Sequence, residues 1–415
     1  MMKAPLLFLC HRIPFPPNKG DKITTFNILK FLSQHYEIHL GCFIDDTFDT
    51  QYEQQVAHFC TRSIFIPISL TYSKLKGLTS LLNGNPITLP FYHRQSMQQW
   101  VDSTIHRYHI DKAFVYSGCM AQYVINPPRK LHTVMHFADI DSDKWRQYAD
   151  KTHGIMKFIY SREYKKLSEY EKTVADLLSI SCFVTETETN AFKAMLPLSL
   201  QDKIHPLENG LNYSYFSPDA HFMLNEAYSL ASENYIVFSG AMDYWANEDA
   251  VLWFSEHVWP AIHRSQPDAK LYLVGSSPSS TVQALSLYPG ITVTGRVKDI
   301  RPYLHYAKAA IAPMQIARGV QNKMLEAMAM ATPIIVSSLT IEGMDPCPSE
   351  NLIVSDEPSD IADWLIDKLI QQPIKAIELR QWIEQHFCWE AKLNPLLAYL
   401  EPSDVDTQRI DNGTI

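Results

Sequence analysis

The sequence lacks a long apolar run, a paired-cysteine motif and an excess of positive charge. No stretch of the 415 residues approaches the ~20 consecutive apolar residues that a membrane-spanning helix needs. The seven cysteines are odd in number and never form a C-x-x-C pair. Neither a disulfide framework nor a zinc knuckle is therefore indicated. Free thiols are typical of a reducing cytoplasm, which is the location that we expect.

The formal net charge is −9, and it is spread unevenly. Residues 1–210 hold 23 Lys and Arg against 20 Asp and Glu, whereas residues 211–415 hold 13 against 25. No face-sized basic stripe with a pI above about 9 is visible, which argues against nucleic acid as a partner. The mildly basic first half leaves contact with a membrane surface open. With 46% hydrophobic and 20% charged residues, the chain can bury ordinary cores, and its length fits two large domains of roughly 150 residues or more.

Short apolar runs alternate with longer helix-patterned stretches along the whole chain, which predicts βα units and mostly parallel sheets. Turn-forming residues at 206–220 separate two such series. The strands expected in the first series are residues 6–10, 37–43, 62–68, 113–116, 133–137 and 182–185. Those expected in the second are residues 235–239, 269–274, 291–294, 309–312, 333–337 and 352–354. The principal helices are expected at residues 22–34, 155–175, 247–265, 320–330 and 390–400.

Residues 317–333 place two cations and a carboxylate around a glycine turn at the start of a predicted helix. Gly319 lets the backbone approach a ligand closely, and the first helical turn offers N–H groups to an anion. Arg318 and Lys323 can neutralise phosphate oxygens. Glu326 faces the same way as Lys323 and can accept hydrogen bonds from sugar hydroxyls. The segment predicts a nucleotide-diphosphate site, and the alternative is a core-packed helix whose charges are merely solvated.

From Gly319 through Pro333 the segment resembles the signature of the retaining glycosyltransferases of the GT-B fold, in particular family four. The resemblance implies that this turn and helix hold the diphosphate and ribose of a nucleotide sugar, with Glu326 on the ribose. The family's first glutamate, eight positions before the second, is here Arg318. Many members also carry a basic pair after the first glycine of the second domain, but residues 240–249 hold no Lys or Arg. Arg318 and Lys323 are the natural substitutes for those cations.

Other segments follow in the order of a GT-B enzyme over nearly the whole chain. Residues 209–218 resemble the motif that joins the two domains of these enzymes. Residues 10–22 and 139–145 resemble the corresponding segments of the glycosyltransferases of exosortase (PEP-CTERM) and exopolysaccharide systems. The resemblance implies an α/β protein with two doubly wound, Rossmann-like domains that face each other across a cleft. Its divisions are an acceptor-side domain at 1–206, a nucleotide-sugar domain at 207–385, a helix that crosses back at 386–401 and a loose tail at 402–415.

Two further loops are candidate parts of the binding site. Lys19 and Gly20 lie in the loop after the first strand, where ligands of doubly wound sheets bind. The resemblance places this loop over the donor phosphates or the acceptor, and the alternative is an ordinary βα connection. In the family the backbone after the glycine of Thr294-Gly295-Arg296-Val297 meets the nucleobase, so the resemblance implies this role for Val297. Arg296 faces either phosphate or solvent.

An acid or base for the acceptor hydroxyl is expected at the carboxyl end of a first-domain strand. His136, Asp139 and Asp141 are the candidates. The alternatives are a core histidine and two aspartates that cap the following helix. A calcium loop from Asp139 to Asp150 is rejected, because Lys144 occupies the position where the turn needs glycine and position twelve is not glutamate. The resemblance also implies that no metal or other cofactor is needed.

We therefore expect a metal-independent, retaining glycosyltransferase of the hexosyltransferase type. It would move a sugar from a nucleotide-diphosphate donor to a hydroxyl of a growing polysaccharide or a lipid-linked glycan, as in exopolysaccharide biosynthesis. A sugar-nucleotide epimerase of the same fold and a non-catalytic scaffold of a polysaccharide assembly stay as alternatives. Two helix-patterned segments carry basic side chains, residues 72–82 and 155–175. They are expected either to contact the inner face of a membrane peripherally or to form an ordinary solvated surface.

Overall fold

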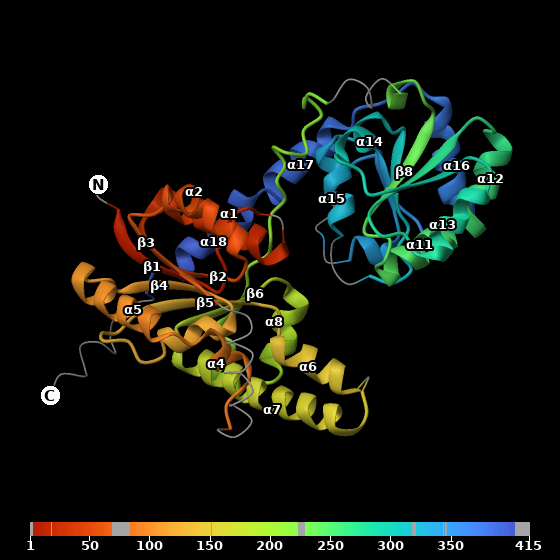
Figure 1. The fold of residues 1–415 in the computed structure, drawn as a ribbon. Helices are drawn as coiled ribbons and strands as arrows, with labels where there is room; N and C mark the ends of the chain where they lie inside the picture. Colours follow the sequence, from red (N-terminus) through yellow and green to blue (C-terminus); the bar gives the residue numbers. More distant parts are fainter. Residues whose placement is uncertain are drawn as a thin grey trace. The chain divides into compact units, whose positions relative to one another are not determined.

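The computed structural model describes residues 3–17, 19–68, 84–150, 152–222, 229–317, 321–342, 344 and 347–402. The chain divides into two compact units, the first of Met1–Asn209 with Lys392–Ile415 and the second of Gly210–Ala391 (Figure 1). The passage from the first unit to the second, between Asn209 and Gly210, lies inside the turn-forming segment 206–220. The helix-patterned residues 72–82 and the tail from 403 lie outside the described residues.

The first unit is built on a parallel sheet that has seven strands within the described residues, in the order β3-β2-β1-β4-β5-β6-β7. Its strands are β1 Ala4–Cys10, β2 Tyr36–Ile44, β3 Arg62–Pro67, β4 Lys112–Tyr116, β5 His132–Ala138, β6 Ile180–Phe183 and β7 Ile204–Pro206. Its α-helices are α1 Gly20–His35, α2 Glu53–Ala57, α4 Thr88–Tyr92, α5 Gln95–Tyr108, α6 Asp141–Asp150, α7 Gly154–Leu177, α8 Glu186–Lys193 and α9 Leu198–Gln201. Two 3-10 helices are η1 Thr47–Tyr52 and η2 Gly118–Tyr123.

The second unit has a parallel sheet of six strands within the described ranges, in the order β10-β9-β8-β11-β12-β13. Its strands are β8 Tyr235–Ser239, β9 Lys270–Val274, β10 Ile291–Gly295, β11 Ala309–Ala312, β12 Ile334–Val336 and β13 Leu352–Val354. Its α-helices are α11 Trp245–His257, α12 Trp259–Ser265, α13 Ser280–Ala284, α14 Arg301–Tyr306, α15 Asn322–Ala329, α16 Pro358–Ile370 and α17 Ile377–His386. The 3-10 helices are η3 Leu285–Leu287 and η4 Ser338–Thr340.

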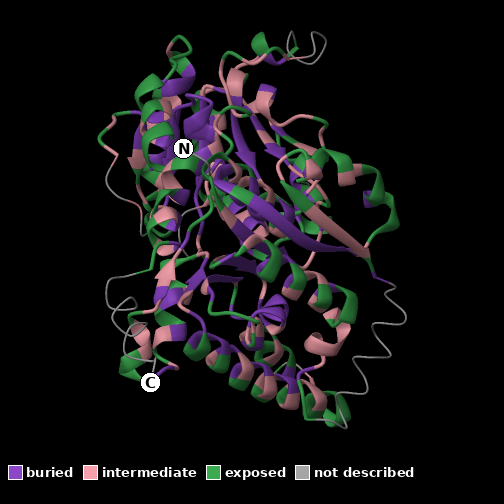
Figure 2. Cartoon of the chain, turned by 90° about the vertical axis from the view of Figure 1, so that its left-hand side faces the viewer, coloured by how far each residue is buried: buried purple, intermediate pink, exposed green. Residues whose placement is uncertain are grey.

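Each sheet reverses its strand order once, between β1 and β4 in the first unit and between β8 and β11 in the second. Such a reversal places helices on both faces of a sheet and opens a crevice at the carboxyl ends of the two strands that flank it. In the second unit, alternate residues of β8 accordingly point to two separate cores. Ile236 and Phe238 pack with α11, α12 and α16, whereas Tyr235 and Val237 pack with α15 and α17. In Figure 2 several strands are buried along most of their length, as β1, β2 and β8 are.

The expected α/β class with two doubly wound domains is confirmed, and the strand positions mostly agree with the pattern. The last large helix, α18 Trp389–Tyr399, begins in the second unit, and its residues from Lys392 belong to the first. There Leu396 and Leu400 are fully buried, and the carbonyl oxygen of Tyr399 lies 2.8 Å from Nε2 of His132. Hydrophobic burial therefore attaches α18 to the first unit.

Three details differ from the sequence-based expectation. The single helix expected over residues 247–265 is two helices, which meet at Val258, because Pro260 in the first turn of α12 cannot donate the hydrogen bond that a continuous helix needs. The strand expected at 182–185 ends at Phe183, since the side chain of Thr185 caps α8 by accepting from the N–H of Glu188 at 3.1 Å. Strand β7 was not expected; it has only three residues.

Within the part of the chain that the structure describes, no helix combines the length and the apolar character that crossing a membrane requires.

Candidate functional site

A cavity of about 490 Å³ opens in the second unit at the carboxyl ends of β8, β9 and β10 and at the start of α15. It lies beside the reversal point of the sheet, which is where doubly wound domains bind their ligands. The walls combine backbone, small polar side chains and three charged residues. The lining residues are Ser239, Gly240, Tyr244, Asn247, Val274, Gly275, Ser276, Arg296, Val297, Ile300, Gln321, Asn322, Lys323 and Glu326.

A glycine directly follows β8 and another directly follows β9, and they allow the two backbones to lie unusually close. A Cβ atom on Gly275 would lie 1.6 Å from the carbonyl oxygen of Gly240, which is far inside van der Waals contact. The N–H of Gly240 donates to the carbonyl of Val274 at 3.0 Å, and that of Gly275 donates to the carbonyl of Gly295 at 3.3 Å. Gly295 has a positive φ of 67°, which favours glycine. This side of the cavity is therefore formed by backbone that a ligand can approach closely.

Lys323 projects from the first turn of α15 into the cavity. Its Nζ donates to Oδ1 of Asn247 at 2.6 Å and lies 3.3 Å from Sδ of Met314. The same ammonium lies 5.0 Å from the centre of the Phe238 ring, within cation–π range. Burial lowers the pKa of Lys323 to about 8, and the negative charge of Glu326 partly opposes that shift. The ammonium is thus partly desolvated. An anion that enters the cavity would replace part of the favourable interaction that the ammonium loses when it leaves water.

Glu326 lies one turn further along α15 and also lines the cavity. Burial raises the pKa of this carboxyl to about 7, and the nearby ammonium of Lys323 acts in the opposite direction. Among the described residues no side chain donates a hydrogen bond to Glu326. The carboxylate is therefore placed to accept hydrogen bonds from a ligand.

Helix α15 presents its N-terminus at the same cavity. Gln321 occupies the N-cap position in an extended conformation, with φ −88° and ψ 127°, and Asn322 and Lys323 form the first turn. The N–H groups of a first helical turn have no carbonyl partner in their own helix and attract anions. The opposite face of α15 is buried in the core that also contains Tyr235 and Val237, and it contributes Met324, Leu325 and Met328. This packing fixes the direction in which Lys323 and Glu326 point. The helix is both the core-packed element and the wall of the cavity.

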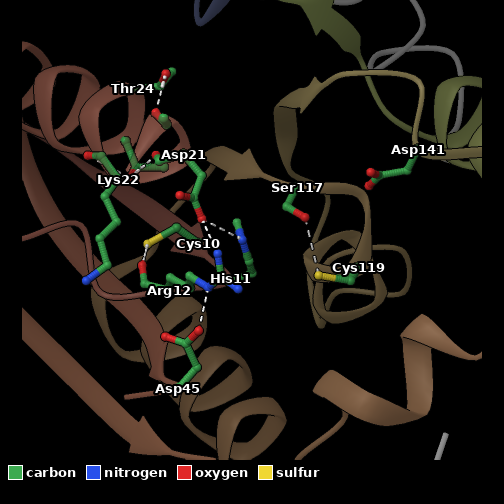
Figure 3. A network of polar contacts seen from close by, with 12 residues as sticks. Cys10, His11, Arg12, Asp21, Lys22, Thr24, Asp45, Ser117, Cys119 and Asp141 are labelled. Atoms are coloured by element: carbon green, nitrogen blue, oxygen red, sulfur yellow. Dashed lines mark hydrogen bonds and ion pairs between the residues drawn. The ribbon is translucent and has the colours of Figure 1, made fainter. Parts of the chain in front are cut away.

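In the first unit, the loop after β1 forms a polar network at the carboxyl end of the sheet (Figure 3). The guanidinium of Arg12 bridges two carboxylates, Asp21 at 2.8 Å and Asp45 at 2.6 Å. Nε2 of His11 lies 3.2 Å from Asp21. Burial alone would raise the pKa of Asp21, but the hydrogen bond and charge of His11 and the charge of Arg12 hold it well below its usual value. This network anchors the loop to the start of α1.

The predicted loop residues take different positions. Lys19 and Gly20 are exposed, at the N-cap and the first position of α1. Lys22 has an exposed fraction of only 2%, and its ammonium is bound to Asp49 at 2.5 Å. The charge of Lys22 is therefore already paired inside the unit and is not available to a ligand.

The three candidates for an acid or base lie in unlike surroundings. His136 is fully buried; its Nδ1 accepts from the N–H of Ala138 at 3.0 Å and its Nε2 lies 3.3 Å from the carbonyl of Leu207. Burial lowers the pKa of His136 to about 4. This is the arrangement of a core histidine, so His136 is not offered to a substrate. Asp139 is exposed, and Asp141 is half-buried with its pKa raised by burial.

The sequence left open that Asp139 or Asp141 caps helix α6. In the structure Glu171 bonds to the start of this helix instead. The carboxylate of Glu171 accepts from both the backbone N–H of Ser142, at 3.0 Å, and its hydroxyl, at 2.5 Å. Glu188 in turn accepts from the N–H of Ile140 at 3.4 Å. The start of α6 is thus held by carboxylates from α7 and α8, so neither aspartate is needed as its cap. Asp141 also forms an ion pair with Lys144 at 3.8 Å.

Within the described ranges, no three His, Cys, Asp or Glu side chains lie close enough together to hold a metal ion. The prediction that no metal is needed stays a prediction, as do the assignments of the site residues.

Residues 233–371, which contain the whole second sheet and the cavity, match the family model described as "Glycosyl transferases group 1". The match covers most of the second unit. The chain as a whole has the GT-B fold. It superposes on HepE of Anabaena, solved in complex with UDP, with a TM-score of 0.60 and 14% identity over 96% of this chain and 99% of that one. Sucrose-phosphate synthase of Thermosynechococcus elongatus gives 0.59 and 15%, over 99% and 100%.

Among curated proteins, an uncharacterized 44.6 kDa protein in the cps region of Klebsiella pneumoniae is 18% identical over 365 residues. The match covers 85% of this chain and 88% of that protein. At these identities the solved structures establish the fold of this chain and leave its substrates open.

The second unit gathers four of the predicted binding residues at one cavity, namely Arg296, Val297, Lys323 and Glu326. Arg318 and Gly319, which were predicted to complete the turn before α15, lie outside the described residues. Asn247 and Ser276 were not predicted to line the cavity. The sequence does contain a signal for Asn247. This residue lies at the start of the helix that follows Ser239-Gly240, and that position places its amide beside the end of the strand.

Proposed function

We propose that this glycosyl transferase is a retaining enzyme that moves a sugar from a nucleotide-diphosphate donor to a hydroxyl of a growing polysaccharide or lipid-linked glycan. One observation carries the proposal: Lys323 and Glu326, three residues apart at the start of α15, both line a single cavity at the reversal point of the second sheet. A cation suits a diphosphate, and a carboxylate can accept hydrogen bonds from the hydroxyls of a ribose.

The chemistry of the cavity supports a diphosphate donor. When the bond between the sugar and the diphosphate breaks, negative charge grows on the departing phosphate oxygens, and preorganised positive charge stabilises that state. Lys323, the N–H groups of the first turn of α15 and Arg296 supply such charge at one cavity. Arg318 would add to it by the family resemblance. Cations and N–H groups in this role make a bound metal unnecessary, which supports metal independence.

The resemblance assigns the ribose to Glu326 and the nucleobase to the backbone at Val297. Glu326 lines the cavity with its carboxylate, and Val297 follows the positive-φ Gly295 at the end of β10. That one structural neighbour was solved with UDP supports a nucleoside diphosphate as the ligand. The base and the sugar are not assigned.

The acceptor side rests on the first unit. Asp139 and Asp141 stay the candidates for a group that takes the proton of the acceptor hydroxyl, since both follow β5 at the carboxyl end of the sheet. A glycan or lipid-linked glycan as acceptor is supported by the printed name of the relative from the cps region of Klebsiella pneumoniae.

Peripheral membrane contact in the cytoplasm fits an acceptor of this kind, and one described feature supports it. At the start of α7, Ile155 and Phe158 are 76% and 71% exposed, and Lys157 lies between them. Large apolar side chains beside a cation are typical of a helix that enters the headgroup region of a bilayer.

The decisive test is ligand binding followed by transfer. UDP, ADP and GDP, alone and as glucose conjugates, are titrated into the full chain and the rise of the melting midpoint is measured. Lys323→Ala is expected to abolish the rise that the wild type shows, whereas Lys30→Ala on the exposed face of α1 keeps it. A wild type that binds none of the diphosphates contradicts the proposal.

Transfer is then followed with the binding donor, a lipid-linked or oligosaccharide acceptor, and EDTA in one arm. A glycan product of retained configuration, formed equally with EDTA, supports the whole proposal. An epimerised free nucleotide sugar without a glycan product identifies the epimerase instead. Binding without any turnover, unchanged in Glu326→Ala, identifies a scaffold.

A further inference from the structure

Asn247 connects the end of β8 to the cation of the donor cavity. It lies in the first turn of α11 with an exposed fraction of 5%, and its Nδ2 donates to the carbonyl oxygen of Ala241 at 2.8 Å. Its Oδ1 accepts from Nζ of Lys323 at 2.6 Å. Only this orientation of the amide satisfies both partners, since a carbonyl can only accept and an ammonium can only donate. The amide is therefore fixed at both ends.

The space around this amide is filled on the side of the strand end. A Cβ atom on Gly240 would lie 2.7 Å from Nδ2 of Asn247 and 3.4 Å from Cε of Lys323. The backbone after β8, the amide and the lysine stem thus pack directly on one another. A side chain at position 240 would therefore clash with the amide and press on the lysine stem.

Among the described residues, the groups in contact with the ammonium of Lys323 all carry no formal charge. They are the amide oxygen of Asn247, the thioether of Met314 and the face of the Phe238 ring. The charged groups that share the cavity from neighbouring elements are Glu326 on α15 and Arg296 after β10. A carboxylate bound to the ammonium would neutralise much of its charge. An uncharged amide holds the ammonium in place and leaves most of its electrostatic field available to a ligand.

We propose that Asn247 is a positioning residue, which fixes the ammonium of Lys323 at the diphosphate end of the donor cavity and, being uncharged, leaves that charge to the ligand. The identity of the ligand rests on the proposed function, but the effect of Asn247 on Lys323 does not. In a merely structural role, Asn247 would hold the turn between β8 and α11, and the charge of the residue at 247 would have no bearing on anions in the cavity.

Two substitutions separate these roles. Asn247→Ala removes both hydrogen bonds, so Lys323 keeps its charge but loses the amide oxygen that fixes its ammonium. Asn247→Asp also loses the bond to Ala241 but places a carboxylate against the ammonium. A positioning role predicts that Asp weakens the binding of anions more than Ala does, whereas a structural role predicts losses that follow the melting midpoints of the two variants. Gln381→Glu, on the exposed face of α17 in the same unit, adds the same charge away from the cavity and serves as the control.

The first measurement uses no ligand. Competitive acetylation of the full chain across a pH series, read by mass spectrometry, gives the titration midpoint of the Lys323 amine. The pKa of Lys323 is lowered to about 8 in the wild type, and Asn247→Asp is expected to raise its midpoint by at least about one pH unit, because a carboxylate within hydrogen-bond distance favours the ammonium. Gln381→Glu is expected to leave it unchanged. An unchanged midpoint in Asn247→Asp overturns the proposal, whether or not the protein binds nucleotides.

The second measurement uses inorganic pyrophosphate and UDP, ADP and GDP as probes, with the uncharged nucleosides beside them. Asn247→Asp is expected to weaken binding of the diphosphates about tenfold or more, and Asn247→Ala about threefold, on the scale of a charge-assisted hydrogen bond. Nucleoside binding is expected to change less than twofold. Equal losses for diphosphates and nucleosides overturn the positioning role. A shifted Lys323 midpoint in a protein that binds no diphosphate upholds the role of Asn247 and refutes the proposed function instead.

Discussion

The carbonyl oxygen of Gly240 occupies the space that a side chain on Gly275 would need, with only 1.6 Å between that oxygen and the position of a Cβ atom. Two adjacent parallel strands, β8 and β9, thus end in backbones that touch. This contact shapes the wall of the cavity in the second unit, and it makes the cavity sensitive to the addition of a single methyl group.

Gly275→Ala is expected to move the ends of β8 and β9 apart. Inserting atoms into a well-packed site costs about 1–3 kcal/mol, so the free energy of unfolding of the second unit should fall by that amount, as measured by urea denaturation. Donor binding should be lost as well, because Gly240 and Gly275 both line the cavity. Gly20→Ala serves as the stability control, since a Cβ there has no atom within 4 Å. Equal stability of both variants would show that the close contact does not exist.

The affinity for a diphosphate is expected to depend on pH through Lys323, whose pKa burial lowers to about 8. A bound diphosphate favours the charged lysine and raises its pKa. Affinity is therefore fully present below about pH 8 and falls as the pH rises through that value, by up to about tenfold per unit. Calorimetric titration of pyrophosphate from about pH 7 to about pH 9.5 measures this fall. Lys323→Arg, whose guanidinium stays charged throughout, should bind with no such decline; a decline that persists in it would point to another group.

The buried pair of Lys22 and Asp49 is expected to stabilise the first unit only as a pair. Asp49→Ala leaves the ammonium buried without a partner, which costs about 3–5 kcal/mol in the free energy of unfolding. The double variant Lys22→Met/Asp49→Leu should recover most of that loss, because it removes both charges. Asp150→Ala, which breaks the exposed pair with Arg146, should cost less than about 1 kcal/mol. Chemical denaturation of the four proteins tests the order, and a large loss in the double variant would contradict it.

The start of α7 is expected to contact lipid headgroups through Phe158 and Ile155. Removing a large apolar side chain that enters a bilayer costs about 1.5–3 kcal/mol of binding, so Phe158→Ser should weaken cosedimentation with vesicles of anionic phospholipid about tenfold or more. Leu198→Ser on α9, where the side chain is 82% exposed, removes a comparable apolar group elsewhere in the first unit and should bind like the wild type. Equal binding of both variants, or no binding by the wild type, would refute this contact.

The strand pattern of the chain could be read almost entirely from the sequence. Buried parallel strands are short runs of apolar residues, and such runs predict β8 at 235–239, β11 at 309–312 and β13 at 352–354 with the bounds that the structure has. The failures are local. Strand β7 is too short to give a pattern, and the break at Val258 depends on one proline whose effect in the first turn of a helix is often neutral.

The sequence by itself determined the α/β class and placed Lys323 and Glu326 on one helix face, because spacing along a helix fixes direction. Only the tertiary structure decided which charges are available. It buried Lys22 against Asp49 and His136 among backbone partners, and it brought Asn247 to Lys323 across 76 positions of the chain. The reason is physical: a periodic pattern records which side faces a core, whereas the pairing of polar groups depends on which strand ends become neighbours in the sheet.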